Sequence, residues 1–258
     1  MKRPSAMRPS ATLLAFGMAS LLAGAAIVPI AWAQSPALTA ALADPSRSAA
    51  DKTRDAASKP DQTVAMTGMK PGDHVADLIP GGGYYTRIFS KVVGPTGKVY
   101  SVVPDVPAQK PERAAAFDAG MKAYPNVSVV RGPLLAFHPA EKLDVIWTSE
   151  NYHDLDIPEF GSQNVAAFDK LVFDSLKPGG VFYVEDHASA PGAGRSVDGT
   201  LHRIDPEQVK KELTAVGFRL EIQSDILSNK ADPHAVTVFD PSIRGHTDKF
   251  VMKFRKPR

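Results

Sequence analysis

The sequence predicts an α/β fold with a mostly parallel sheet of seven strands, an antiparallel last strand and helices on both faces. Short apolar segments alternate with longer segments of helical periodicity, which is typical of strand–helix–strand units. The loop after the first apolar segment has three consecutive glycines, residues 81–83, where strand passes into helix. Two segments that alternate polar and apolar residues close the chain, and such alternation indicates antiparallel strands.

Each strand is expected from its apolar composition and from the turn-forming residues beside it. The expected strands are residues 74–80, 98–103, 126–132, 143–150, 181–187, 218–225 and 248–256. The helices that connect them are expected at residues 84–93, 111–124, 159–176 and 205–218. Pro111 and Pro206 suit a first helical turn, and Asp205 suits a helix cap. Because parallel strands end at one edge of a sheet, the residues that follow them should meet there.

The first 33 residues have the character of an export leader. A basic start is followed by an apolar stretch over residues 11–30 and by small residues at the positions that a signal peptidase reads. We therefore expect a signal peptide at residues 1–33, a periplasmic or secreted protein, and no stable membrane insertion after cleavage. An uncleaved anchor is the alternative, because the apolar stretch approaches the length of a membrane span. Residues 34–62 are expected to be a linker and an N-terminal helix, and residues 63–258 the main domain.

Composition excludes several classes of protein. The chain has no cysteine, and this rules out disulfides, a thiolate nucleophile and cysteine-ligated metals. Without the three basic residues of the leader, 27 Lys and Arg residues stand against 28 Asp and Glu residues. A nearly neutral chain without long basic runs argues against nucleic acid as the main partner. A small-molecule substrate is the expected partner.

The glycine loop does not match a phosphate-binding motif. No G-x-G-x-x-G spacing passes through residues 81–83, and Tyr84 and Tyr85 stand where a P-loop needs Lys and Ser or Thr. Glycine permits positive φ and has no Cβ, so it lets the backbone approach a ligand closely. A simple turn from strand to helix is the alternative.

The segment HVADLIPGGGYYTRIFSKVVGPTGKVYSV, residues 74–102, resembles the first motif of class I S-adenosylmethionine-dependent methyltransferases. SLKPGGVFYVEDH resembles the turn into their fifth strand, and VKKELTAVGFRLE resembles their late helix and sixth strand. The similarity extends over residues 64–256 and is greatest to exported predicted methyltransferases that carry P-G-G-G-Y-Y-T. It implies the Rossmann-like methyltransferase sandwich and S-adenosylmethionine as cofactor.

The resemblance also implies a cofactor site at the glycine loop. Asp77 would lie near the amino group of the cofactor's methionine part. Ile79 replaces the family's first glycine, and Val103 and Pro133 stand where acids that bind ribose and adenine are usual. Asp105 would replace the ribose-binding acid if its loop bends back. The predicted cofactor-binding residues are Asp77, Pro80, Gly81, Gly82, Gly83, Tyr84, Asp105 and Asn151.

Candidate catalytic residues follow the fourth and fifth strands and precede the last helix. Methyl transfer to oxygen or nitrogen often needs a base, and His153, His187 and His202 are the predicted catalytic residues, with His153 as the first candidate. Each could instead have only a packing or hydrogen-bonding role. Asp154 and Asp186 add metal-binding oxygens, but no spacing motif such as H-E-x-x-H occurs, so no metal site is predicted.

The predicted function is S-adenosylmethionine-dependent methyl transfer to a small-molecule acceptor that the sequence does not identify. The alternative is an exported, non-catalytic protein that binds a small ligand on the same fold. Residues 227–248 form a long connection that carries Phe239 and is expected to line the acceptor side, with ordinary surface as the alternative. Arg203 is a candidate for binding an acidic substrate or for a local ion pair.

Overall fold

The computed structural model describes Met1 and residues 35–105, 111–160 and 164–258. The predicted leader, Met1 apart, lies outside the described residues. None of the described helices is long and apolar enough to cross a membrane.

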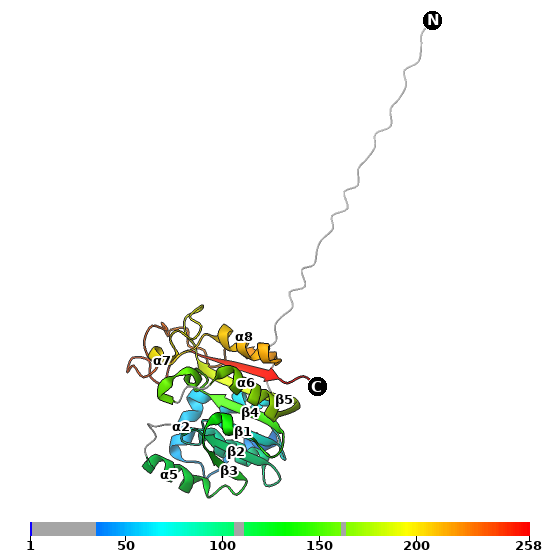
Figure 1. Cartoon of the computed structure of the whole chain (residues 1–258), viewed down its shortest axis with the longest axis vertical. Coiled ribbons are helices and arrows are strands. Elements are labelled where there is room, and N and C mark those ends of the chain that lie inside the picture. Colours follow the sequence, from blue (N-terminus) through cyan, green and yellow to red (C-terminus); the bar gives the residue numbers. More distant parts are fainter. Residues whose placement is uncertain (2–34, 106–110, 161–163) are drawn as a thin grey trace. The chain divides into compact units, whose positions relative to one another are not determined.

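Seven strands from the described residues form one sheet in the order β3-β2-β1-β4-β5-β7-β6. Figure 1 shows β3, β2, β1, β4 and β5 following one another up the view. The first five strands pair in parallel, whereas β7 is antiparallel to both of its neighbours. The predicted sheet and its antiparallel last strand are therefore confirmed. The strands are β1 (His74–Leu78), β2 (Lys98–Val103), β3 (Val127–Arg131), β4 (Leu143–Ser149), β5 (Leu176–His187), β6 (Arg219–Ser224) and β7 (Lys249–Arg255).

Apolar side chains cover both faces of the sheet, because neighbouring residues of a strand point to opposite sides. Trp147 packs in one core cluster with residues of α1, α3 and α4, and Ile146 packs in the other with residues of α6 and α8. The helices are α1 (Pro36–Ala43), α2 (Ala49–Ser58), α3 (Pro60–Thr67), α4 (Tyr84–Val93), α5 (Pro111–Met121), α6 (Val165–Ser175), α7 (Asp198–Leu201) and α8 (Pro206–Val216). Short 3₁₀ turns are η1 (Leu134–Ala136), η2 (His153–Asp156) and η3 (Pro158–Phe160).

The N-terminal segment differs from the prediction of a linker and one helix over residues 34–62. Helix α1 buries Leu38 and Ala41 in the core, so this part of the chain belongs to the folded domain. Pro60 was expected to end a helix, but it also begins α3. Proline is compatible with the end of one helix and the start of the next, because it cannot continue a helix but suits a first helical position. Lys59, in the left-handed conformation, separates α2 from α3.

Three further boundaries differ from the expectations. The helix expected from residue 159 begins at Val165, where the side chain of Asn164 accepts the Ala167 N–H as a cap. The turn expected at residues 177–180 lies inside β5, where the register with β4 shifts. Helix α7, Asp198–Leu201, forms in the connection after β5, where no helix was expected.

The long connection over residues 227–248 is fixed by a buried ion pair. The guanidinium of Arg203 is fully buried and lies 2.8 Å from the carboxylate of Asp232, whose side chain is also fully buried. Arg203 also donates to the backbone oxygens of Ala188 and Val236. Arg203 thus forms an ion pair, but its partner is Asp232 and not the neighbouring Asp205, whose side chain caps α8.

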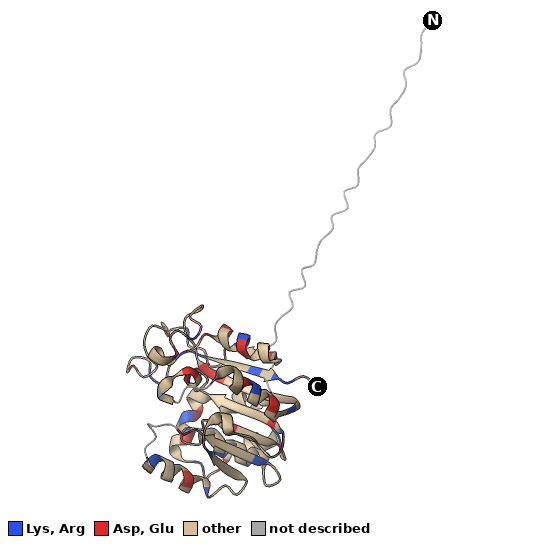
Figure 2. Ribbon diagram, viewed as in Figure 1, with Lys and Arg blue, Asp and Glu red and all other residues tan. Residues whose placement is uncertain are grey.

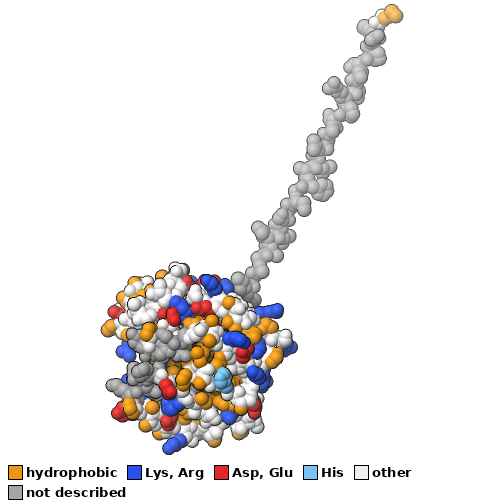
Figure 3. Space-filling view, viewed as in Figure 1, with side chains coloured by type: hydrophobic (Ala, Val, Ile, Leu, Met, Phe, Trp, Pro, Cys, Tyr) orange, Lys and Arg blue, Asp and Glu red, His pale blue; other side chains and the backbone are white. Residues whose placement is uncertain are grey.

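Charges of both signs are mixed over the described surface. In Figure 2 the Lys and Arg residues are interspersed with Asp and Glu residues along the helices and strands. The face in Figure 3 shows apolar side chains between groups of both charges. The charge distribution therefore gives no reason to revise the expectation of a small-molecule partner.

Candidate functional site

The loop after β1 adopts backbone conformations that glycine favours. Gly81 has φ +54° and Gly83, which caps α4, has φ +78°. Ile79 also has a positive φ, +56°, although a β-branched side chain is rarely found in this region. The isoleucine that replaces the family's first glycine therefore keeps a glycine-like backbone.

The three glycines have different surroundings. A Cβ added to Gly83 would lie 2.8 Å from the Met121 side chain of α5, so this glycine lets α5 pack against the loop. A Cβ added to Gly81 or Gly82 would meet no atom within 4 Å among the described residues. Gly81 and Gly82 thus leave the open space beside the backbone that a ligand would need, whereas Gly83 allows α5 to pack against the loop.

Two cavities lie against this loop and share Ile79, Pro80, Gly81 and Asn151. The first has a volume of about 150 Å³ and is mainly apolar; its other lining residues are Val103, Pro104, Leu134, Asp154, Leu155 and Phe160. The second has a volume of about 130 Å³ and is mainly polar; its other lining residues are Arg54, Asp77, Tyr84, Tyr85, Ser149 and Glu150. We call them the apolar cavity and the polar cavity.

Most of the predicted cofactor-binding residues line these cavities, but three do not. Asp77, Pro80, Gly81, Tyr84 and Asn151 are lining residues. Gly82 and Gly83 belong to the loop without lining either cavity, and Asp105 is exposed beyond the end of β2. Asp105 itself does not line the apolar cavity, and its replacement of the missing acid stays a prediction.

Asp77 lies at the floor of the polar cavity with only 2% of its surface exposed. Burial raises the pKa of its carboxyl to about 7, although a hydrogen bond from Thr86 favours the ionised form. The Thr86 hydroxyl donates to Asp77 at 2.5 Å. The Ser149 hydroxyl, on β4 beside this site, is buried and has no hydrogen-bond partner among the described residues.

Arg54 of α2 supplies a positive charge to the polar cavity, and the sequence analysis did not identify it. Its guanidinium lies 4.6 Å from the centre of the Tyr84 ring and donates to Ser58. Within residues 35–105, 111–160 and 164–258, no carboxylate forms an ion pair with Arg54. The sequence signal was the polar helix itself, in which Asp51 and Asp55 flank this arginine.

Helix α2 is held against the glycine loop by its acidic residues. Asp51 pairs with Arg87 at 2.6 Å, and Arg87 also donates to the backbone oxygen of Gly82. The Tyr84 hydroxyl donates to Asp55 at 2.6 Å. These contacts place Arg54 over the cavity.

Glu150 follows β4 with φ +60° and contributes a carboxylate to the polar cavity. Lys249 of β7 lies 2.7 Å from Glu150 and 3.4 Å from Glu185. Burial opposes ionisation of Glu150, but Lys249 and His187 outweigh it and lower its pKa to about 2. Lys249 escaped the sequence analysis, because only the antiparallel β7 brings it to this edge.

The three predicted catalytic histidines lie together at the ends of β4 and β5. The ring of His153 lies 6.0 Å from that of His187 and 5.4 Å from that of His202. The buried carboxylate of Asp186 accepts from the His153 backbone N–H and lies 2.8 Å from its Nδ1. His187 Nδ1 lies 2.8 Å from the Thr247 hydroxyl.

The ionisation of two of these histidines differs. Burial opposes charge on His153, but the carboxylates of Asp186 and Asp154 outweigh it and raise its pKa to about 10. Burial lowers the pKa of His187 to about 4, against the attraction of Glu150 and Asp186. At neutral pH His153 therefore already carries its proton, and His187 is the neutral imidazole with the capacity to accept one.

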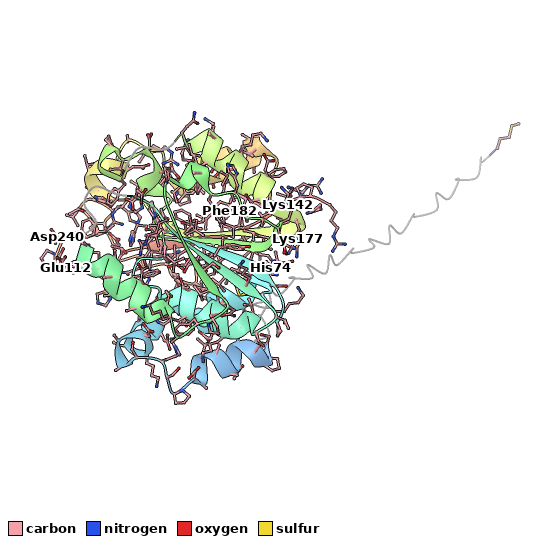
Figure 4. The ribbon with its side chains drawn as sticks, turned by 60° about the horizontal axis from the view of Figure 1, so that its bottom comes forward. His74, Glu112, Lys142, Lys177, Phe182 and Asp240 are labelled. Atoms are coloured by element: carbon pink, nitrogen blue, oxygen red, sulfur yellow. The ribbon has the colours of Figure 1, made fainter. Side chains whose placement is uncertain are left out.

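The site lies at the edge of the sheet where the parallel strands end. Figure 4 shows His74, Lys142 and Lys177 on one side of the molecule, and Glu112 and Asp240 on the other. His74 begins β1, so the first side holds the amino end of this strand. In the strand order, β2 and β3 follow on one side of β1, and β4 and β5 follow on the other. The order therefore reverses beside β1, and such a switch point is where α/β sheets bind ligands.

Comparisons with known proteins agree with this architecture. A search for family models found no match. The chain is 36% identical over 123 residues to the ubiquinone/menaquinone biosynthesis C-methyltransferase UbiE of Pseudomonas aeruginosa, covering 46% of this chain and 43% of that protein. It is 29% identical over 197 residues to UbiE of Pseudomonas paraeruginosa, covering 74% and 66%. The chain thus spans less than half of the first relative.

Solved structures show the same fold. An S-adenosylmethionine-dependent methyltransferase from Aquifex aeolicus has a TM-score of 0.54 at 20% identity, covering 76% of this chain and 88% of that one. The N-methyltransferase NodS from Bradyrhizobium japonicum has a TM-score of 0.55 at 16% identity, covering 81% and 99%. The chain therefore has the Rossmann-like class I methyltransferase fold, and it is similar in sequence to the UbiE C-methyltransferases.

The chain has an apolar wall at the two places where the methyltransferase pattern has acids. Val103 ends β2 and lines the apolar cavity, as the sequence predicted. Pro133 precedes η1, whose Leu134 continues the wall. Polar atoms come instead from Asn151, which donates to the backbone oxygen of Ile79 at 3.1 Å, and from Asp154.

Proposed function

We propose that this protein transfers a methyl group from S-adenosylmethionine to a small aromatic acceptor. The proposal rests on one observation above all: a polar cavity with an arginine free of ion pairs joins an apolar cavity along one glycine loop. The two chemical halves of S-adenosylmethionine, a zwitterionic amino acid and an adenosine, match these two environments. Bound there, it supplies an electrophilic methyl group on a positively charged sulfur.

The polar cavity fits the amino-acid half. Arg54 would pair with the carboxylate, because a guanidinium forms two parallel hydrogen bonds to such a group. The carboxylates of Asp77 and Glu150 would bind the ammonium group. The unpaired Ser149 hydroxyl is a further polar atom that such a ligand would satisfy.

The apolar cavity fits the adenosine half. Val103, Leu134 and Leu155 offer apolar contacts to a purine ring, and Asn151 and Asp154 offer polar atoms to the ribose or the base. The two cavities together approach the lower end of ligand-pocket volumes, roughly 300 Å³. Recognition of the adenosine would therefore depend mainly on apolar contacts, because Val103 and Pro133 stand where acids that bind ribose and adenine are usual.

Aromatic side chains favour an aromatic acceptor. The His202 ring lies 4.9 Å from that of Phe239 and 6.1 Å from that of Phe160, which lines the apolar cavity. Phe239 is 56% exposed, and aromatic side chains of this kind can stack on a planar ring. Because two relatives are named ubiquinone/menaquinone biosynthesis C-methyltransferases, a quinol is the first acceptor to test.

The second candidate is the binding protein without methyl transfer. The observation that favours it is the apolar wall at Val103, which provides no carboxylate for ribose. The two candidates differ in turnover, so the decisive assay follows a label from methyl-labelled S-adenosylmethionine into quinols of increasing size.

The transfer assay uses Arg54→Gln with Arg131→Gln as matched control, because Arg131 is an exposed arginine that pairs with Asp118 and lines neither cavity. We expect label transfer by the native protein and by the control. Arg54→Gln should raise KM for S-adenosylmethionine by about tenfold to a hundredfold, which corresponds to the loss of a charged hydrogen bond. Binding of S-adenosylmethionine without transfer to any quinol would support the second candidate instead.

A further inference from the structure

Three metal-ligating side chains converge beside the apolar cavity. One ligand atom each from His153, Asp154 and His202 lies within 4.8 Å of the other two. The Oδ1 atom of Asp154 lies 3.1 Å from Nε2 of His153 and 3.4 Å from Nδ1 of His202. Two of these residues come from η2, and the third caps α7, some 50 residues further along the chain.

The oxygen at the centre of this group has no hydrogen bond among the described residues. Asp154 Oδ1 is buried, and the facing imidazole nitrogens of His153 and His202 lie 3.1 and 3.4 Å from it without meeting hydrogen-bond geometry. A cation between the three side chains would bind this oxygen directly and would displace any proton from the imidazole nitrogens that face it.

A second carboxylate orients one of the proposed ligands. The fully buried Asp186 lies 2.8 Å from Nδ1 of His153 and also accepts the backbone N–H of the same residue. The Nε2 atom of His153 is thereby directed toward Asp154. Metal-binding histidines commonly have such a carboxylate behind the ring, which fixes the ring and increases its basicity.

The distances suit a small transition metal. Zn²⁺ binds nitrogen and oxygen at about 2.0–2.1 Å in a tetrahedron, so its ligand atoms stand about 3.3 Å apart. Two of the three separations, 3.1 and 3.4 Å, agree with this value. Mg²⁺ prefers oxygen ligands and octahedral geometry, which a set of two imidazoles and one carboxylate does not offer.

We propose that His153, Asp154 and His202 form a binding site for a divalent transition metal, with Zn²⁺ as its probe. Asp186 is the positioning residue. Because the His202 ring lies 4.9 Å from that of Phe239, where the acceptor is proposed to stack, an open coordination position on this side would be accessible to an acceptor molecule. A metal in this place would bind and polarise an acceptor oxygen. The site goes beyond the proposed methyl transfer, and metal binding is measured in the cofactor-free protein, so its outcome does not depend on binding of the cofactor.

The test titrates the cofactor-free protein with Zn²⁺ by calorimetry and with Co²⁺ by visible absorption. The native protein should bind one ion per chain and give the intense absorption of tetrahedral Co²⁺. Asp154→Asn and His202→Asn should each weaken Zn²⁺ binding at least about tenfold, and Asp186→Asn about tenfold to a hundredfold. Asparagine tolerates the positive φ of +55° at residue 202.

The matched control is His74→Gln. His74 also pairs with a carboxylate, that of Glu141 at 3.0 Å, but it lies on the opposite side of the sheet (Figure 4). This variant should bind Zn²⁺ as the native protein does. Far-ultraviolet circular dichroism identifies any variant that fails to fold. His202→Asn is the substitution expected to disturb folding least, because residue 202 is partly exposed. The proposal is overturned if the native protein shows no saturable binding at micromolar Zn²⁺, or if folded His202→Asn and Asp154→Asn bind as tightly as the control.

Discussion

The buried carboxylate of Asp77 makes stability depend on pH in a way that one substitution should remove. Burial raises the pKa of this carboxyl from 3.8 to about 7 in the folded protein. The folded state therefore holds a proton that the unfolded state has lost across this interval. As pH rises from about 4 to about 7, the free energy of unfolding decreases, and the penalty is complete above pH 7. The shift corresponds to at most about 4 kcal/mol.

Asp77→Asn replaces the ionisable group with a neutral one of the same shape. The difference in unfolding free energy between the variant and the native protein isolates the titration of Asp77, because other groups contribute equally to both. We expect the variant to gain about 2–3 kcal/mol relative to the native protein between pH 5 and pH 8. Urea denaturation at these two pH values measures the difference. A difference that stays constant with pH would refute the raised pKa.

The same substitution should weaken the binding of S-adenosylmethionine. The ligand's ammonium group favours the ionised carboxylate, so binding to the native protein should release a proton and tighten as pH rises from 5 to 7. Asp77→Asn should bind less tightly and show a flatter pH dependence in this range. A variant that is both more stable and less able to bind would indicate that Asp77 is kept for the ligand at a cost in stability.

Three further predictions follow from the glycine loop, the long connection and the leader. Gly83→Ala should destabilise the protein by about 2–4 kcal/mol in urea denaturation, because residue 83 has a positive φ and the new methyl group would lie close to α5. Gly82→Ala adds its methyl group in open space and should change stability by less than about 0.5 kcal/mol. Equal effects of the two substitutions would contradict the packing role of Gly83. Asp232→Ala leaves a buried guanidinium without its carboxylate and should cost about 3–5 kcal/mol, with faster proteolysis of residues 227–248. Arg244→Ala, at an exposed residue of the same connection, is the control, and equal proteolysis rates of the two variants would contradict the structural role of the ion pair. Cell fractionation and N-terminal sequencing should find an exported protein cleaved after Ala33, and an intact cytoplasmic chain would contradict the signal peptide.

The fold could be predicted because its signals are local in the sequence. The alternation of apolar strands and amphipathic helices locates β1 to β7, and helix α4 has the predicted boundaries, residues 84–93. The N-terminal helices were harder, because α1 has a weak polar–apolar pattern and is stabilised by burial of Leu38 and Ala41 against the rest of the fold. A helix that is stabilised by packing against distant residues is difficult to predict from the residue pattern of its own short segment.

The site could be predicted only where its residues follow a strand directly. Asp77, Asn151 and the three histidines come at strand ends or at a helix start, so topology alone brings them to one edge. Arg54 and Lys249 come from α2 and from the antiparallel β7, and their positions depend on how these elements pack. The approach of both His153 and His202 to Asp154 was not predicted, because the position of His202 depends on α7, which was not expected.

Calorimetric titration with S-adenosylmethionine tests the central claim most directly, since binding of this ligand at the glycine loop underlies the proposed function. We predict a single saturable site in the native protein and in Arg131→Gln, with affinity at least about tenfold lower in Arg54→Gln. The absence of any binding heat from the native protein at millimolar S-adenosylmethionine would contradict the account.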